Sequence, residues 1–346
     1  MMRLPWFDYR TPTSVAEAVE ILAGEGPDAM IVAGGTDVLP NMKRRQQVPK
    51  TLVALRDVGE LRQSSNGDGL TLGAGLTLTD VVRDSRVRET YPGLWQAAVQ
   101  VATPHLRNMG TLGGNLCLDT RCTYYDQNYE WRKAIGFCMK KEGQTCWVAP
   151  SSKRCLAVSS TDTAPALIAL GAQVTLVSSD GEREVAVRDL YNNDGIDYIT
   201  RRPDELMTRI RLESDSGWSS TYWKLRRRGS FDFPVLSVAA AARFAGDGSV
   251  EECRIVLGAV ASRPQPADAA AQTLIGKKLT DATIVEAGVS ASRLAKPMDN
   301  TDFTLHWRKK VAAEFVGYAL RELRGDDMRE TRVRIAQHDL EGAAAL

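Results

Sequence analysis

The 346-residue sequence lacks the features that direct a chain to membranes or to nucleic acids. No apolar run approaches the roughly 20 residues that a membrane-spanning helix needs. The stretch Met1–Asp8 contains no apolar segment typical of a secretory signal, so a cytoplasmic location is expected. The formal net charge of +1 provides no global field that would attract nucleic acid or an acidic membrane surface.

Histidine is scarce, and several common motifs are missing. The sequence has only His105, His306 and His338, and no convincing set of general acids and bases accompanies them. We therefore expect no catalytic residue in this chain, and expect His105 to pack near the loop that follows it. There is no Gly-x-Gly-x-x-Gly motif, no Walker loop, no internal repeat and no low-complexity tract.

Length and composition predict a globular protein of two or three domains. Hydrophobic residues make up 43% of the chain and charged residues 25%, both ordinary for a folded protein. The patterns predict an α+β fold with a first lobe over 1–57, a second lobe over 58–216, a third region over 217–325 and a polar, loose tail over 326–346.

The order of predicted elements supports this division. In the first lobe, Ser14 and Glu17 predict a capping box for a helix over 12–24, followed by short strands at 29–33 and 51–56. The second lobe is expected to contain a strand at 70–74, helices at 79–90 and 93–102, a helix at 163–170, and a strand at 172–177 that ends in an Asp180-Gly181 turn. The third region is expected to form antiparallel strands at 221–227, 235–244 and 252–260, then helices at 266–275, 280–294 and 304–323.

Two glycine-rich loops are candidates for binding an anion. Gly34-Gly35-Thr36-Asp37 follows a buried strand, and adjacent glycines allow backbone N–H groups to converge on a phosphate. The alternative is a plain tight turn. The stretch 107–115 is a second such loop, too rich in glycine for a helix, with Thr111 and Asn115 as further donors. Two loops of this kind are able to hold the two phosphates of a dinucleotide.

Three other side chains fit such a site. Asp162 is either an N-cap of the helix that follows it or an acceptor for ribityl or ribose hydroxyls. Strand alternation places Tyr222 and Lys224 on the same side of their strand. There the aromatic ring could cover a flavin, and the ammonium could stabilise the reduced flavin. The alternative for this basic stretch is a solvated face.

Together these motifs resemble the FAD-binding medium subunits of the molybdenum hydroxylases, the family of xanthine oxidase. The segments Ala33–Asp37, Arg107–Asn115, Ser160-Thr161-Asp162 before Pro165, and Tyr222-Trp223-Lys224 occur in the family's order, and the resemblance covers about residues 1–325. It implies a two-lobed, vanillyl-alcohol-oxidase-like FAD-binding fold and a C-terminal domain of a three-stranded antiparallel sheet with helices.

The resemblance also implies roles for individual residues. Asp162 would contact the ribityl or ribose hydroxyls, and Lys224, with Tyr222, would approach the isoalloxazine ring. The FAD pyrophosphate would lie against Val32, Ala33, Gly34, Gly35, Thr36, Asp37, Thr111, Gly113, Gly114 and Asn115.

One departure from the family is an insert of about forty residues, spanning 117–157. The family's Gly-Gly-Asn and aspartate motifs lie close together, whereas Asn115 and Asp162 are 47 positions apart here. The insert contains cysteines with the spacing C-x15-C-x7-C-x8-C, at Cys122, Cys138, Cys146 and Cys155. Disulfides are disfavoured in a reducing cytoplasm, so we expect a metal site.

The spacing does not select the metal, because four thiolates suit either zinc or an iron–sulfur cluster. We favour [4Fe–4S], since zinc has no redox chemistry and an electron-transfer flavoprotein would gain an electron port from a cluster. Cys117 and Cys253 are expected to be buried core residues. The aromatic stretch 124–131 would either shield the cluster from water or simply pack the insert.

A four-cysteine insert makes the sequence resemble one branch of the family, the flavin subunits of 4-hydroxybenzoyl-CoA reductases. That resemblance implies reductive dehydroxylation of 4-hydroxybenzoyl-CoA to benzoyl-CoA in anaerobic aromatic degradation. Electrons would pass from reduced ferredoxin through [4Fe–4S] and FAD to a small [2Fe–2S] subunit and then to a large molybdopterin-binding subunit, in a dimer of heterotrimers.

Two other functions are compatible with the residues. One is the FAD subunit of another molybdenum hydroxylase that oxidises xanthine, carbon monoxide, an aldehyde or an N-heterocycle, with a structural metal in the insert. The other is a stand-alone, metal-stabilised binding protein without a redox role.

Overall fold

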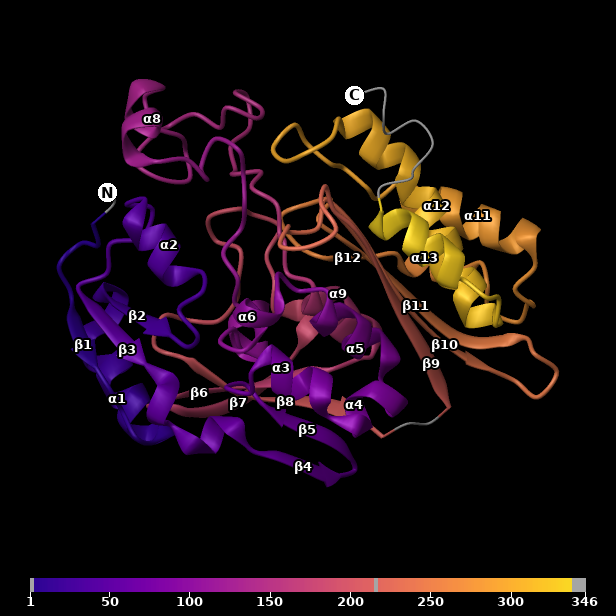
Figure 1. Ribbon diagram of the computed structural model, residues 1–346, viewed down its shortest axis with the longest axis horizontal. Coiled ribbons are helices and arrows are strands. Elements are labelled where there is room, and N and C mark those ends of the chain that lie inside the picture. Colours follow the sequence, from indigo (N-terminus) through magenta and orange to yellow (C-terminus); the bar gives the residue numbers. More distant parts are fainter. Residues whose placement is uncertain (1–2, 215–216, 338–346) are drawn as a thin grey trace.

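The computed structural model describes residues 3–214 and 217–337. It has three parts that lie side by side, with the second lobe between the first lobe and the third region (Figure 1). The arrangement confirms the predicted α+β class. Within the described residues, no helix is both long enough and apolar enough to cross a membrane.

The first lobe is a small parallel sheet with the strand order β1-β3-β2. Its elements are β1 (Asp8–Arg10), α1 (Val15–Glu25), η1 (Gly26–Asp28), β2 (Ala29–Val32), α2 (Val38–Lys43), β3 (Thr51–Ala54) and η2 (Leu55–Asp57). The predicted capping box is only half formed: Ser14 accepts a hydrogen bond from the Glu17 N–H, while the Glu17 carboxylate accepts from Thr13. Ala18, Val19 and Leu22 turn one face of α1 toward the core.

The second lobe is built on a five-stranded antiparallel sheet with the order β4-β5-β8-β6-β7. The strands are β4 (Ser64–Gly67), β5 (Gly69–Gly73), β6 (Gln173–Ser178), β7 (Gly181–Ala186) and β8 (Leu206–Glu213). The predicted Asp180-Gly181 turn is confirmed, with Gly181 at φ +127°, a conformation that favours glycine. The sequence patterns missed β8, although it occupies the centre of the sheet.

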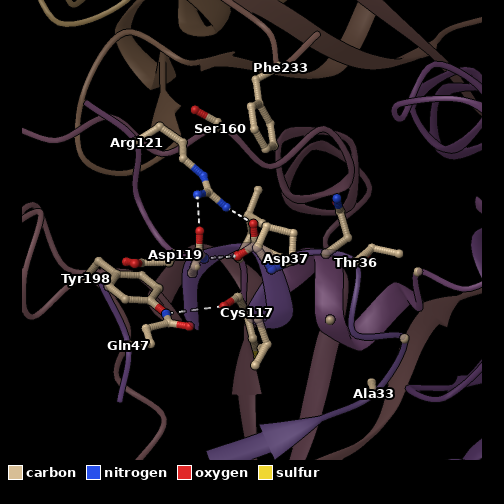
Figure 2. A pocket seen from close by; sticks show the side chains of 18 of the residues that line it. Ala33, Thr36, Asp37, Gln47, Cys117, Asp119, Arg121, Ser160, Tyr198 and Phe233 are labelled. Carbon is tan, nitrogen blue, oxygen red and sulfur yellow. Dashed lines mark hydrogen bonds and ion pairs between the residues drawn. The ribbon is translucent and has the colours of Figure 1, made fainter. Parts of the chain in front are cut away.

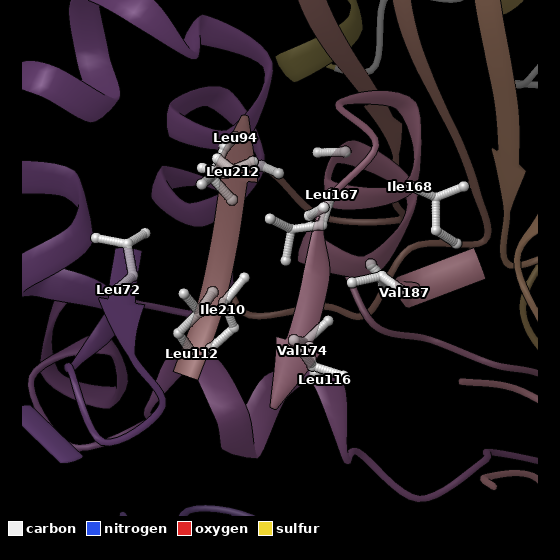
Figure 3. Close-up of a cluster of buried hydrophobic side chains, with 14 of the residues drawn as sticks. Leu72, Leu94, Leu112, Leu116, Leu167, Ile168, Val174, Val187, Ile210 and Leu212 are labelled. Atoms are coloured by element: carbon white, nitrogen blue, oxygen red, sulfur yellow. The ribbon is translucent and has the colours of Figure 1, made fainter. Parts of the chain in front are cut away.

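Short helices cover this sheet. They are η3 (Gly59–Arg62), α3 (Leu78–Arg83), α4 (Ser85–Thr90), α5 (Pro92–Val99), α6 (Pro104–Arg107), α7 (Leu112–Leu116), α9 (Thr163–Ala169) and η4 (Val187–Asp189). The helix predicted over 79–90 is two helices, because Asp84 is extended and its side chain accepts from the Arg86 N–H to cap α4. Figure 3 shows the core beneath them, where Leu112 and Leu116 of α7 lie near Val174 and Ile210 of the sheet.

The third region is a twisted antiparallel sheet with helices on one side. Its elements are β9 (Trp218–Leu225), β10 (Leu236–Phe244), β11 (Val250–Gly258), β12 (Gln265–Pro266), α10 (Asp268–Gln272), α11 (Asp281–Ser292), α12 (Leu305–Arg324) and α13 (Arg329–Ala336). The three predicted strands are confirmed, and β12 adds a two-residue edge.

The predicted loose tail is wrong for its first half. Residues 329–336 form α13, and Met328 and Ile335 are buried in the core of the third region. The Arg332 guanidinium lies 4.0 Å from the Trp223 ring centroid and pairs with Glu322 at 2.5 Å. Packing therefore orders a segment whose polar composition suggested otherwise. The rest of the predicted tail, residues 338–346, lies outside the described residues.

The insert is an irregular lobe whose one α-helix is α8 (Tyr129–Ala134). In Figure 1, α8 lies beside α2 of the first lobe. Hydrogen bonds join the insert to the first lobe. The Gln46 side chain donates to the Tyr125 carbonyl at 2.5 Å, and the buried Arg132 side chain donates to the Arg44 carbonyl at 3.0 Å. The insert is thus attached to the first lobe rather than projecting freely.

Candidate functional site

A cleft of about 1170 Å³ lies where the two lobes, the insert and the third region meet (Figure 2). Its volume exceeds the roughly 300–1,000 Å³ typical of small-molecule sites, so it has room for a dinucleotide. Of the predicted FAD-binding residues, those that line the cleft are Ala33, Gly34, Gly35, Thr36, Asp37, Thr111, Gly113, Gly114, Asn115 and Asp162. Val32, Tyr222 and Lys224 do not line it.

The two glycine-rich loops are in direct contact. A side chain added at Gly34 would place its Cβ 1.9 Å from the Met109 carbonyl oxygen, which is far inside a van der Waals contact. Gly35 has φ +71°, where a Cβ is disfavoured. On the other side, Gly110 lies close to the Thr36 hydroxyl. Both loops therefore present their backbones to the same part of the cleft.

The second loop differs from the prediction, because Leu112–Leu116 forms the short helix α7. Thr111 caps it by accepting from the Gly114 N–H at 3.0 Å, and Leu112 and Leu116 bury their side chains beneath it. Gly113 is needed because a Cβ there would lie 2.8 Å from that of Ala74. Packing overcomes the low helix propensity of two adjacent glycines.

Asn115 joins this loop to the segment on the far side of the insert. Its side-chain oxygen accepts from the Thr161 hydroxyl at 2.9 Å and from the Thr163 hydroxyl at 2.7 Å and backbone N–H at 3.1 Å. The two halves of the predicted site are therefore in contact, although 47 positions separate Asn115 from Asp162. The insert therefore begins and ends beside the predicted site.

Asp162 is not a helix cap in this structure. It precedes α9, but its side chain makes no capping bond and turns instead toward β9. There it accepts from the Tyr222 hydroxyl at 2.7 Å and from the Lys224 ammonium at 2.9 Å. Tyr222 and Lys224 do share one side of the strand, as alternation predicts. They lie behind Asp162, however, and hold its carboxylate at the wall of the cleft.

Burial governs the ionisation of this pair. It raises the pKa of Asp162 and lowers the pKa of Lys224, and in each case the partner's charge opposes the effect. The Lys224 side chain is fully buried and also donates to the Gln100 carbonyl at 3.0 Å. A buried carboxylate held by two donors is a well-positioned acceptor for hydroxyl groups.

The insert contributes Arg121, a site residue that the sequence analysis missed. Arg121 is buried, and its guanidinium pairs with Asp37 of the first glycine loop and donates to Asn41 at 3.2 Å. Burial opposes the charge on Arg121, but Asp37, Asp119 and Asp126 together raise its pKa. The pair neutralises a carboxylate that would otherwise repel a phosphate. Spacing carries no signal for this contact, because its two residues are far apart in the sequence.

The four predicted ligand cysteines are all buried in the insert, between 5% and 8% exposed. Cys122, Cys138 and Cys155 pack with Tyr125 in one cluster. Backbone N–H groups of Tyr124 and Tyr125 point at the Cys122 sulfur. The Ala157 N–H donates to the Cys155 sulfur at 3.4 Å. N–H donors of this kind stabilise thiolates.

Burial raises the pKa of Cys122 to about 12 and that of Cys155 to about 11. Among residues 3–214 and 217–337, no three His, Cys, Asp or Glu side chains are placed to hold one metal ion. Cys122 lines the cleft, whereas Cys138, Cys146 and Cys155 do not.

Glycines fit closely around these cysteines. A Cβ at Gly195 would lie 2.6 Å from the Cys155 sulfur, and one at Gly143 would lie 2.7 Å from the Cys138 nitrogen. Gly195 comes from the second lobe, so a residue outside the insert packs against Cys155.

The remaining candidates divide as follows. Cys253 is partly buried against the core of the third region, and Cys117 against that of the second lobe, where it also lines the cleft. The aromatic stretch is mixed, since Tyr125 is 3% exposed and Trp131 39%. His105 is exposed on α6 and does not pack as expected, because that helix turns it to solvent.

Comparisons with known proteins cover nearly the whole chain. The family model for the FAD binding domain in molybdopterin dehydrogenase matches residues 5–212, and that for the CO dehydrogenase flavoprotein C-terminal domain matches residues 220–323. The chain is 33% identical over 274 residues to the aldehyde oxidoreductase FAD-binding subunit of Escherichia coli (strain K12), covering 76% of this chain and 84% of that one.

Two carbon monoxide dehydrogenases are also similar. The medium chain from Afipia carboxidovorans is 28% identical over 308 residues, which is 88% of this chain and 92% of that one. The structure of carbon monoxide dehydrogenase from Hydrogenophaga pseudoflava matches with a TM-score of 0.77 at 27% identity, over 92% of this chain and 98% of that chain.

Proposed function

This chain belongs to the FAD-binding subunits of the molybdenum hydroxylase family, and we propose that it relays electrons between FAD in the cleft and a [4Fe–4S] cluster held by the insert. One observation carries the FAD part of the proposal: the two glycine-rich loops touch at Gly34 and Met109 and face one large cleft.

The residues in the cleft fit FAD. The backbones of 33–37 and 111–115 would hold the pyrophosphate, and the Arg121–Asp37 pair would keep that region from being anionic. Asp162 would accept from ribityl or ribose hydroxyls, and Tyr222 and Lys224 would hold its carboxylate in place. Bound flavin exchanges one or two electrons, so it can join one-electron clusters to other carriers.

The proposed [4Fe–4S] cluster rests on the four buried cysteines of the insert. Cys122, Cys138, Cys146 and Cys155 supply the four thiolates that a cubane requires, and their surroundings are dry and contain N–H donors. These observations favour a second redox centre at Cys122, Cys138, Cys146 and Cys155.

We propose a reductive role for the complex. Its substrate would be 4-hydroxybenzoyl-CoA, which takes up two electrons and two protons and releases water to give benzoyl-CoA. Reduced ferredoxin would supply the electrons at the insert. A small [2Fe–2S] subunit and a large molybdopterin-binding subunit would receive them from FAD, in a dimer of heterotrimers. The names of the relatives, as medium chain or FAD-binding subunit, support companion chains.

The alternative substrate class is one that the complex oxidises. The 33% identity to an aldehyde oxidoreductase subunit favours this possibility, with electrons leaving through FAD and a structural metal in the insert.

Anaerobic purification of the native complex tests both readings. We expect FAD by chromatography of the released flavin, iron and sulfide in excess of the amounts held by the small [2Fe–2S] subunit, and a reduced [4Fe–4S] signal, distinct from the [2Fe–2S] signals, by electron paramagnetic resonance. Cys138→Ser should lose that signal and keep FAD, whereas Cys253→Ser, outside the insert, should keep both. Zinc in place of that additional iron would overturn the cluster proposal, and absence of flavin would overturn the electron-transfer role. Turnover of 4-hydroxybenzoyl-CoA with reduced ferredoxin, compared with oxidation of aldehydes, decides the substrate.

A further inference from the structure

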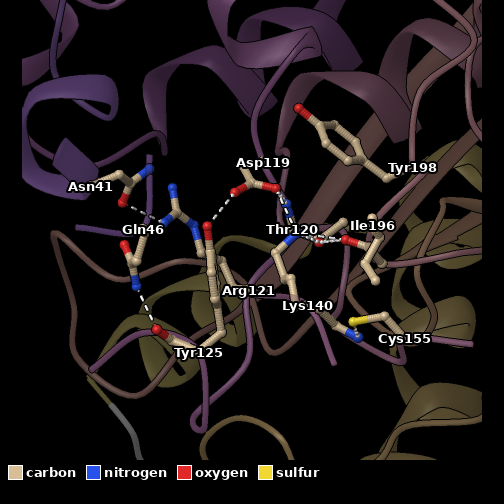
Figure 4. Close-up of polar contacts among 12 residues, drawn as sticks. Asn41, Gln46, Asp119, Thr120, Arg121, Tyr125, Lys140, Cys155, Ile196 and Tyr198 are labelled. Atoms are coloured by element: carbon tan, nitrogen blue, oxygen red, sulfur yellow. Dashed lines mark hydrogen bonds and ion pairs between the residues drawn. The ribbon is translucent and has the colours of Figure 1, made fainter. Parts of the chain in front are cut away.

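A buried ion pair joins Lys140 to Asp119, a residue that lines the cleft (Figure 4). The Lys140 ammonium contacts the Asp119 carboxylate at 2.8 Å, with side chains 6% and 9% exposed. Neither residue was a candidate in the sequence. Buried lysine and aspartate pairs are costly to desolvate, so their retention invites a functional explanation.

The positive end of this pair faces the cysteines. Lys140 follows Cys138 by two residues, and its ammonium donates to the Gly195 carbonyl at 2.5 Å. Gly195 packs directly against the Cys155 sulfur, where an added Cβ would lie only 2.6 Å away. A single glycine therefore separates the ammonium from a predicted cluster ligand.

The negative end faces the cleft. Asp119 lines the cleft, whereas Lys140 does not. The carboxylate also accepts from the Tyr125 hydroxyl at 3.2 Å and the Thr120 N–H at 2.8 Å. The Lys140 ammonium lies 4.9 Å from the ring centroid of Tyr125 and 5.6 Å from that of Tyr198, so aromatic faces enclose it and exclude water.

We propose that the Lys140–Asp119 pair sets the relative reduction potentials of the two centres, raising that of the cysteine-held cluster and lowering that of the flavin. This inference rests on the proposed function. A nearby positive charge stabilises the reduced form of a cluster, and a nearby negative charge destabilises a reduced, anionic flavin. The low dielectric of this buried wall makes both effects larger than at the surface.

Potentiometric titration of the anaerobically purified full chain tests the inference, with the cluster followed by electron paramagnetic resonance and the flavin by absorbance. Lys140→Met should shift the cluster potential to more negative values, and Lys140→Arg should restore most of the wild-type value. Asp119→Asn should shift the flavin potential to more positive values. Lys141→Met is the matched control, because this neighbouring lysine is half-exposed and should leave both potentials unchanged.

A role in packing alone would not give opposite shifts from the two ends of one pair. Unchanged potentials in Lys140→Met with full iron content would overturn the inference. If Lys140→Met assembles no cluster, the Asp119→Asn variant provides the test. An unchanged flavin potential in Asp119→Asn also overturns the inference. Wild-type protein without iron or flavin would instead contradict the proposed function, before any variant is compared.

Discussion

Replacing Lys224 with Met isolates the energetic role of the ammonium behind Asp162. The substitution keeps an unbranched side chain but removes the charge from a pair whose side chains are 0% and 3% exposed. Removing one partner of a buried ion pair costs about 3–5 kcal/mol. The Gln100 carbonyl loses one donor but keeps its bond from Arg226 at 3.1 Å, so it adds little to this cost.

The loss should depend on pH. Burial raises the pKa of Asp162, and the ammonium opposes that rise, so the pKa in Lys224→Met is higher still. A carboxyl whose pKa is higher in the folded than in the unfolded protein costs no stability when it is protonated in both states. The penalty grows as the pH rises from the unfolded pKa to the folded pKa, and it is constant above the folded pKa. The variant should therefore lose more stability at about pH 8 than at about pH 5.

Thermal denaturation followed by circular dichroism, at both pH values, measures this effect. At about 2–4 °C per kcal/mol for a cooperative unit of about 150–250 residues, we expect Tm to fall by roughly 6–20 °C at the higher pH. Adding Asp162→Asn to Lys224→Met should recover part of the loss, since no buried charge then remains. A loss below about 1 kcal/mol at both pH values, or a double variant no better than the single one, would refute the reasoning.

Three further predictions concern the loops and the insert. Gly34→Ala should separate the two glycine-rich loops and abolish FAD retention, measured as the flavin-to-protein absorbance ratio, because its Cβ would meet backbone at 1.9 Å. Gly24→Ala, with nothing within 4 Å, should retain FAD and be neutral or slightly stabilising, and loss of flavin in both variants would contradict the explanation. Gly195→Ala should lower the iron content while FAD stays bound, and normal iron would show that the close approach to cysteine is unimportant. Arg121→Gln should weaken FAD binding in equilibrium dialysis, because Asp37 then faces the cofactor without its cation, and an unchanged affinity would argue against that role.

Much of the fold could be predicted from local patterns. The helix begun by Ser14, the turn at Gly181 and the three long strands of the third region depend on neighbouring residues, through caps, positive φ and alternation. The missed elements are those that packing imposes. α7 contains two glycines and is held by its buried leucines, and α13 is polar but contacts Trp223 through Arg332.

The candidate site also has features that local patterns predict and features that only packing produces. The residues alone indicated two glycine-rich segments as candidates for binding a dinucleotide and grouped four cysteines in one insert, because glycine conformation and ligand type are properties of the residues. Only the tertiary structure decided what surrounds them. It turned Tyr222 and Lys224 toward Asp162, paired Arg121 with Asp37, and paired Lys140 with Asp119. Such contacts join residues far apart in the chain, and their distances follow from how whole elements pack, which no local pattern encodes.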